Sequence, residues 1–350
     1  MSSKKFMFRY ISYILIVFLF CFSCGTSTIM VNVQRPADIT VPLHIKNVVI
    51  ANRSTPNKEN LAENIVEGIL TGEVVGSDKK GSKYCINGLV NALSNSERFA
   101  LKNQGEIMLK GTGTSQFPDL LSWRKVQKIC DQYDADALIV LSTFDSDSRE
   151  FEGKSVVRNR TIKGAKVREI KYPVTLAMEI QSGWRIYDAS KRKIIDVNTF
   201  TELKESKIWG SSYNDARSKL PSKRQALKSA GIFAGEKYAY RITPLWVRVS
   251  RTYFSGPEDK LKLAKKYVSR QDWDEAIKLW KSLVDNNDPK IARKANYNLA
   301  LASEINGTLS TAIEYALRSE NLGEKRASLY IRILKKRQKD QERLKEQIIN

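Results

Sequence analysis

The chain has 350 residues, with 59 Lys and Arg against 38 Asp and Glu, which gives a formal net charge of +21. Its 42% hydrophobic and 28% charged residues are typical of a globular protein and exclude a disordered chain or a polytopic membrane protein. At roughly 150 residues per domain, this length predicts two domains. The single histidine, His44, excludes a multi-histidine zinc site and leaves little room for histidine-based catalysis.

The N-terminal segment has the pattern of an export signal. Lys4, Lys5 and Arg9 precede an uncharged run from Ile11 to Phe22. That run is too short to cross a bilayer as a helix, but it fits the apolar core of a signal peptide. We therefore expect residues 1–23 to be a signal peptide, with an uncleaved anchor as the alternative.

Ser23, Cys24 and Gly25 follow this run. They resemble a bacterial lipobox, in which the cysteine is acylated and the preceding peptide is removed, although Cys21 and Phe22 depart from the usual upstream residues. The resemblance implies a lipid on Cys24. Because no acidic residue follows in the next ten positions, it also implies the periplasmic side of the outer membrane.

Residues 24–42 are polar and contain Pro36 and Pro42, which predicts an extended tether. The apolar run Ile45–Asn52 then predicts a buried strand that opens an α/β domain over residues 43–255. Further along that domain we expect two helices after the first strand, a short strand, a helix leading into a buried strand, a hairpin and a last helix. Their ranges are 61–69, 89–93 with a start near Gly81, 98–102, 120–132, 137–141, 174–187 with 193–201, and 224–241.

Two cysteines of the exported part, Cys85 and Cys130, lie at apolar positions of predicted helices. An oxidising compartment permits a disulfide between them, and buried free thiols fit equally well. Their spacing matches no zinc pattern, so we expect no metal site.

Residues 149–171 contain eight basic and three acidic residues around Gly164, which predicts an exposed basic hairpin over residues 150–171. Export argues against nucleic acid as the normal partner. Acidic envelope polymers such as peptidoglycan or lipopolysaccharide remain, as does a merely solvated surface. The side chains expected to bind such a polymer are Arg158, Arg160, Lys163, Lys166 and Arg168.

Three segments of the first domain carry a resemblance to envelope proteins: IKNVVIAN at 45–52, LVNALSNSERFAL at 89–101 and YDADALIVL at 133–141. They resemble the N-terminal domain of TolB, the curli secretion lipoprotein and the lipoprotein activators of penicillin-binding proteins. The resemblance implies an α/β (α+β) fold with a mixed sheet and no particular activity. The whole layout is also similar to an uncharacterised lipoprotein family of Bacteroidetes-type bacteria.

Residues 256–350 contain an internal repeat. Apolar and small residues recur with a displacement of 36 residues, for example Ala264 with Ala300 and Ala276 with Ala312. The pattern resembles the tetratricopeptide repeat, which implies an all-α domain of paired helices with a terminal helix. Two repeats cannot bury their apolar faces alone, so we expect them to pack against the first domain or against a partner.

In the repeat family, the first helix of each pair lines a concave groove. That pattern places Lys265, Lys294, Tyr297 and Leu301 in the groove, with Tyr297 and Leu301 as its apolar centre. The alternative is that these helices simply complete a core.

Searches for catalytic chemistry find little. The glycine-rich run at 110–115 lacks the ending of a phosphate-binding loop, and no nucleophile elbow or HExxH motif occurs. We therefore expect no cofactor and a non-enzymatic periplasmic adaptor that binds an envelope protein through its repeats and α/β domain. A binding module for an acidic polymer is the alternative.

Overall fold

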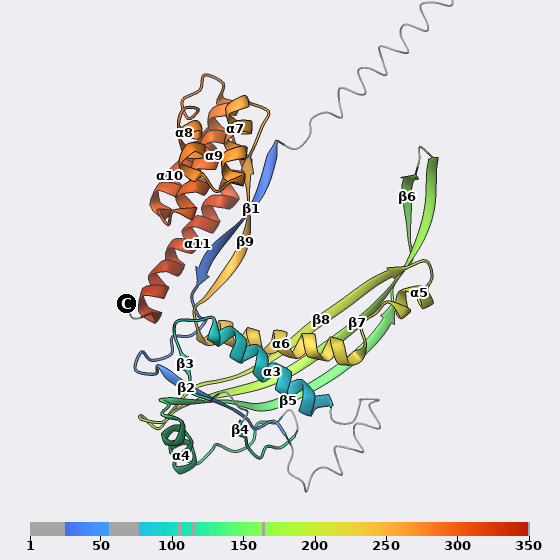
Figure 1. The fold of residues 1–350 in the computed structure, drawn as a ribbon, viewed down its shortest axis with the longest axis vertical. Coiled ribbons are helices and arrows are strands. Elements are labelled where there is room, and N and C mark those ends of the chain that lie inside the picture. Colours follow the sequence, from blue (N-terminus) through green and yellow to red (C-terminus); the bar gives the residue numbers. More distant parts are fainter. Residues whose placement is uncertain (1–24, 56–76, 104–106, 114–115, 163–164, 349–350) are drawn as a thin grey trace, which may run out of the picture. The chain divides into compact units, whose positions relative to one another are not determined.

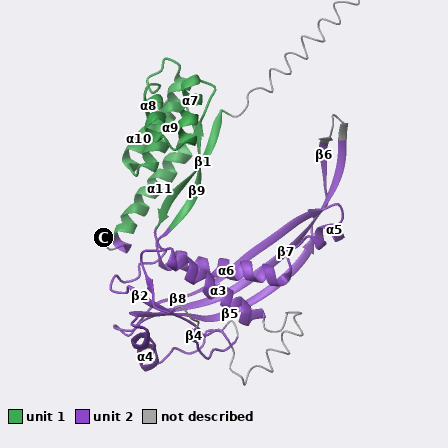
Figure 2. Ribbon diagram, in the orientation of Figure 1, with its two compact units in different colours: residues 1–35, 246–345 green, residues 36–245, 346–350 purple. Residues whose placement is uncertain are grey.

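The computed structural model describes residues 25–55, 77–103, 107–113, 116–162 and 165–348, and of residues 161, 162, 165 and 166 it describes the backbone alone. The chain divides into two compact units (Figure 2). Residues 36–245 with 346–350 form what we call the sheet unit, and residues 1–35 with 246–345 form the helical unit.

The sheet unit is built around a mixed β-sheet (Figure 1). Strand β2 lies parallel to β3, β4 and β5, whereas β5, β6 and β8 each run antiparallel to β7. This confirms the predicted α/β domain with a mixed sheet. The strands are β2 (Asn47–Asn52), β3 (Ala100–Leu101), β4 (Ile107–Met108), β5 (Ala137–Glu152), β6 (Val156–Ile162), β7 (Ala165–Asp188) and β8 (Lys193–Gly210).

Both faces of this sheet are covered by helices. Val48 and Ile50 of β2 enter a core shared with α3 and α6, whereas Val49 and Ala51 enter a second core with α4. Burial on both faces explains why this strand is an uninterrupted apolar run in the sequence. The helices are α3 (Ser77–Ser94), α4 (Trp123–Tyr133), α5 (Tyr213–Ser218) and α6 (Lys223–Ile242).

Helices α3 and α6 touch through their backbones. A Cβ atom on Gly88 would lie 2.1 Å from the carbonyl oxygen of Ile232, and one on Gly235 would lie 1.9 Å from that of Cys85. Only glycine fits at these two positions, so they fix how closely the two helices approach over the sheet.

Several elements extend past their predicted ends. Strand β5 continues to Glu152 and β8 to Gly210, and α3 begins at Ser77 rather than near Gly81. Both strands pair with β7, which has 24 residues, so backbone hydrogen bonds to β7 carry them beyond the apolar pattern that predicted them. The predicted helix at 61–69 lies outside the described residues.

Among its described residues, the helical unit contains five helices and a two-stranded sheet (Figure 1). The helices confirm that an α-helical region follows the α/β region. The elements are β1 (Thr26–Arg35), β9 (Leu245–Phe254), α7 (Asp259–Ser269), α8 (Trp273–Lys281), α9 (Pro289–Ile305), α10 (Leu309–Asn321) and α11 (Lys325–Gln347), the last residues of which belong to the sheet unit.

The predicted tether over residues 24–42 is wrong for most of its length, because Thr26–Arg35 is a strand paired with β9. Val31 and Val33 alternate into the core of the helices together with Tyr253 and Phe254 of β9. The compact units divide the chain elsewhere than the predicted boundary at 255/256, because the helical unit includes β9 from Trp246 onward. A sheet of two strands is stable here because the helices cover it.

The small residues of the repeat pack as the pattern predicts. Ala264, Ala276, Ala300 and Ala312 are each 0% exposed, so paired helices approach closely at these positions. The turns between the helices of each pair also correspond. Gln271 has a φ of 62° and Gly307 a φ of 77°, so the glutamine adopts the left-handed backbone that glycine adopts in the second pair.

Candidate interaction site: the basic hairpin

Strand β6 and the first part of β7 form a two-stranded hairpin that extends from the sheet. Val156 lies opposite Lys171 and Ile162 opposite Ala165, so Lys163 and Gly164 fall between the strands and outside the described residues. We call residues 156–171 the basic arm. Its β-branched residues favour strands, and its attachment to the long β7 stabilises a hairpin that is marginal by itself.

The arm presents arginines to solvent on both of its faces. Arg158 and Arg160 are exposed on one face, and Arg168, opposite Asn159, is exposed on the other. In the described part of the chain, no ion pair joins any of these three arginines to a carboxylate. Their positive charge is therefore available to a partner. The side chain of Lys166 is not among those described.

A tryptophan on the neighbouring strand enlarges this site. The guanidinium carbon of Arg158 lies 5.2 Å from the centre of the Trp209 ring, and Nζ of Lys207 lies 5.1 Å from the same ring. Cations near an aromatic face are stabilised by its quadrupole. The sequence prediction missed Trp209 and Lys207 because it ended this strand at Thr201. Between Glu202 and Trp209 the exposure alternates in the structure but the residue types do not, so the sequence offered no signal for this extension.

Acidic residues near the arm are already paired. Glu169 accepts from Lys171 at 2.5 Å, and this hydrogen bond, with the charges of Lys171, Arg160 and Arg158, lowers the Glu169 pKa. At the base of the arm, Arg217 binds Glu150 at 2.6 Å and Glu152 at 2.7 Å. The sequence of the arm therefore contains six basic residues and one acidic residue.

Apolar side chains lie among the cations. Val156, Val157, Val167 and Ile170 are each 42–44% exposed. Exposed cations interspersed with apolar groups can bind an extended anionic molecule, because the cations attract its charges and the apolar groups pack against its less polar parts.

The predicted groove residues have a different environment. Tyr297 is 7% exposed and Leu301 is 0% exposed, so the prediction that they face outward is wrong. The Tyr297 ring packs 5.4 Å from Phe254 of β9 and 5.2 Å from Tyr330 of α11. The two-stranded sheet and the last helix therefore occupy the face that the repeat family leaves open.

The two lysines of that predicted site are not brought together around an apolar centre. Lys265 is exposed on α7, whereas Lys294 is half-buried with its Nζ 5.8 Å from the centre of the Phe254 ring. The structure thus removes the apolar centre and leaves no described groove between these cations.

The same unit contains a buried charged cluster. Glu304 is 1% exposed and accepts from Arg251 at 2.9 Å, from Arg337 at 2.7 Å and from the Tyr330 hydroxyl at 2.6 Å. Burial alone would raise the Glu304 pKa, but these hydrogen bonds and the Arg251 charge hold it below its usual value. The cluster joins β9, α9 and α11.

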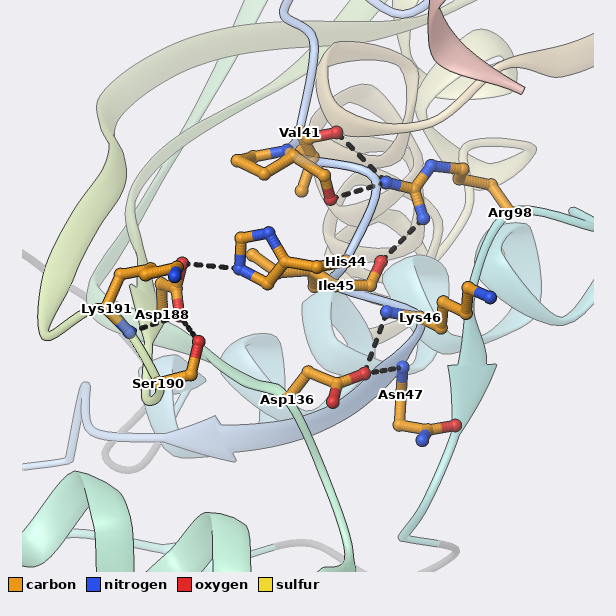
Figure 3. A network of polar contacts seen from close by, with 11 residues as sticks. Val41, His44, Ile45, Lys46, Asn47, Arg98, Asp136, Asp188, Ser190 and Lys191 are labelled. Atoms are coloured by element: carbon orange, nitrogen blue, oxygen red, sulfur yellow. Dashed lines mark hydrogen bonds and ion pairs between the residues drawn. The ribbon is translucent and has the colours of Figure 1, made fainter. Parts of the chain in front are cut away.

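His44 belongs to a polar network at the start of β2 (Figure 3). Its Nε2 lies 2.8 Å from Oδ2 of Asp188, whose Oδ1 accepts from the Ser190 hydroxyl at 3.0 Å. The serine donates to the carboxylate and not to the histidine, so the contact that activates a nucleophile in a hydrolase triad is not formed.

The rest of this network binds backbone. Oδ2 of Asp136 accepts from the N–H groups of Lys46 and Asn47 at 2.8 and 2.7 Å, and Arg98 donates to the carbonyl of Ile45 at 2.6 Å (Figure 3). These contacts hold in place the segment that leads into β2, so the network stabilises the fold.

Cys85 and Cys130 are buried free thiols, so no disulfide bond joins them. Burial raises the pKa of both, to about 12 for Cys130, where the neighbouring carboxylates Asp131, Asp136 and Asp188 contribute. Within the described ranges, no group of three or more His, Cys, Asp or Glu side chains is arranged to hold a metal ion.

Cys24, the predicted lipid-attachment residue, lies outside the described residues. Among the helices that are described, none combines the length and apolarity needed to cross a bilayer.

Two family models match the chain. Domain of unknown function (DUF8603) matches residues 45–254, and Domain of unknown function (DUF6340) matches residues 262–341. No curated protein matches.

Similar solved structures include a PelC dodecamer from Paraburkholderia phytofirmans, with 11% identity and a TM-score of 0.23, covering 61% of this chain and 100% of that one. Another is a putative neuraminyllactose-binding hemagglutinin homolog from Helicobacter pylori, with 13% identity and a TM-score of 0.24, covering 69% of this chain and 93% of that one.

Proposed function

The chain belongs to the DUF8603 family, and we propose that it is a non-enzymatic binding protein of the bacterial envelope whose basic arm takes up an acidic envelope polymer such as peptidoglycan or lipopolysaccharide. In this proposal, acyl chains on Cys24 hold it on the periplasmic side of the outer membrane. The tetratricopeptide-like helices pack against the strand that follows Cys24 and so hold the lipid-anchored end of the chain in a folded unit.

The observation that carries the proposal is a set of arginines on the arm that form no ion pair with any described carboxylate. Arg158, Arg160 and Arg168 are exposed, and the acids at the base of the arm, Glu150 and Glu152, are bound by Arg217. An acidic polymer offers repeated negative charges that match such a row of cations.

Burial of Tyr297 and Leu301 favours this function over a protein-binding groove in the repeats. The apolar centre of that groove is part of the core. Within the described residues, the arm instead combines available charge with exposed apolar side chains.

The test is retention of the purified, acylated full-length protein on immobilised lipopolysaccharide and on peptidoglycan sacculi. Substituting Arg158, Arg160 and Arg168 with Gln should reduce retention by at least about tenfold, which corresponds to about 1.4 kcal/mol. Raising the ionic strength past the point where the Debye length is about 8 Å should release the unmodified protein.

The matched control substitutes Lys335, Lys336 and Lys339 with Gln, because these exposed residues of α11 carry the same total charge and belong to the helical unit. Equal loss in both variants would show that only net charge matters. Salt-resistant retention of the arm variant would contradict the proposed function.

A further inference from the structure

We propose that the helical unit sits directly on the membrane surface, with the end that carries Gly25 at the level of the lipid headgroups. This inference rests on the proposed lipid attachment at Cys24. It adds what that attachment does not specify, namely which surface of the unit meets the lipid and how close it lies.

The first argument is the length of free chain. Strand β1 begins at Thr26, which is two positions after Cys24 in the sequence, and one residue extends a chain by less than about 4 Å. An acylated Cys24 would therefore leave one residue between the lipid and the strand. A lipid-anchored protein with so short a connection cannot extend away from the bilayer.

The second argument is that Gly25 itself is held in place. Its carbonyl oxygen accepts from the N–H of Ser255 at 2.8 Å, and the Ser27 hydroxyl donates to that of Ser255 at 2.9 Å. A Cβ atom on Gly25 would lie 2.8 Å from the carbonyl oxygen of Gly256, so the two segments are in close contact. Burial of Val31 and Val33 fixes the rest of the strand. The anchor point is thus part of the folded unit.

The surface around this point is polar and carries both signs of charge. Ser255 and Gly256 lead into α7, whose first turn exposes Asp259 beside Lys260, and Nζ of Lys260 lies 2.9 Å from the hydroxyl of Ser282. Polar side chains of this kind can lie among lipid headgroups, whereas the attachment itself comes from the proposed acyl chains.

The opposite end of the two-stranded sheet should then lie away from the membrane. Arg248 is exposed on β9, and its seven-residue separation from Ser255 corresponds to about 23 Å along the strand. Lys260 and Arg248 are therefore a matched pair, because both are exposed basic residues of the helical unit at different distances from Gly25.

The experiment places a fluorescent label on Lys260→Cys or Arg248→Cys in the acylated full-length protein. The protein is reconstituted into phosphatidylethanolamine and phosphatidylglycerol vesicles with a headgroup-attached quencher. Buried Cys85 and Cys130, with their raised pKa values, should not react with the label. We expect several-fold stronger quenching at position 260, since a headgroup layer is only about 6 Å thick on each side of the bilayer.

A second variant inserts ten Gly and Ser residues between Cys24 and Gly25, which adds a flexible connection of about 17 Å. Quenching at position 260 should then fall toward that at position 248. Equal quenching at both positions of the acylated protein, or no effect of the spacer, would overturn the inference and leave the lipid attachment intact. An N-terminal peptide whose mass shows no acyl chains would overturn both.

Discussion

The helical unit and the basic arm use arginine in opposite ways. In the helical unit, Arg251 and Arg337 surround Glu304, and the carboxylate is buried with both of them bound to it. In the arm, Arg158, Arg160 and Arg168 are exposed, and nearby carboxylates are bound by other cations. The difference lies in where the carboxylates are. Arginines that bind a buried carboxylate hold the surrounding strands and helices together. Arginines that have no such carboxylate beside them can bind a partner molecule instead.

The largest expected effect comes from removing the buried acid. Substituting Glu304→Gln should destabilise the helical unit by about 3–5 kcal/mol, because two partly buried guanidinium groups lose their counter-charge. Faster hydrogen exchange in peptides of α9 and α11 would report this loss, while Glu314→Gln, on the exposed surface of α10, should have little effect. Unchanged exchange in the Glu304 variant would show that the cluster does not stabilise the unit.

The burial of the predicted groove residues gives the next largest effect. Leu301→Ala should cost about 2–5 kcal/mol, as truncations in a packed core do. Leu329→Ala on α11 is the matched control, because Leu329 is 56% exposed and its truncation should cost less than about 0.5 kcal/mol. Equal melting temperatures for the two variants would contradict the packing of α9 against its neighbours.

Acid should weaken the helical unit through Glu304. Its pKa is lower in the folded chain than in the unfolded chain, so its contribution is present above the unfolded value. That contribution is lost as the pH falls through the folded pKa, because protonation removes the charge that Arg251 and Arg337 bind. Hydrogen exchange of α9 between pH 7 and pH 3, corrected for intrinsic rates, measures the loss. Glu304→Gln should flatten this pH dependence, and an equally steep profile would point to another group.

The smallest effect on stability is expected in the arm. Replacing Arg158, Arg160 and Arg168 with Gln should change the free energy of unfolding by no more than about 0.5 kcal/mol for each substitution, since all three are exposed and form no ion pair with a described carboxylate. The same variant should lose polymer retention. A large drop in its melting temperature would mean that these arginines support the fold, as Arg251 and Arg337 do.

Local patterns were sufficient for most elements. The apolar run at 45–52 predicted β2, the alternation at 174–187 and 193–201 predicted the pairing of β7 with β8, and the repeated alanines predicted the helical pairs. Each of these signals reports which face of a single element is buried, and such a face is visible within a short window of sequence. The exposed basic hairpin was predicted from another local signal, the excess of basic residues around Gly164.

Pairings between distant segments were not predictable in this way. The stretch after Cys24 places Ile29, Val31 and Val33 at alternate positions, and only the partner strand β9, more than 200 residues later, makes it a strand. Tyr297 and Leu301 have the spacing of groove residues, and only β9 and α11 make them core. The sequence by itself determined the elements and their buried faces, whereas the tertiary structure decided which element covers which face. The apolar face of an element must be shielded from water by another element. The residues of that face do not specify which part of the chain packs against them.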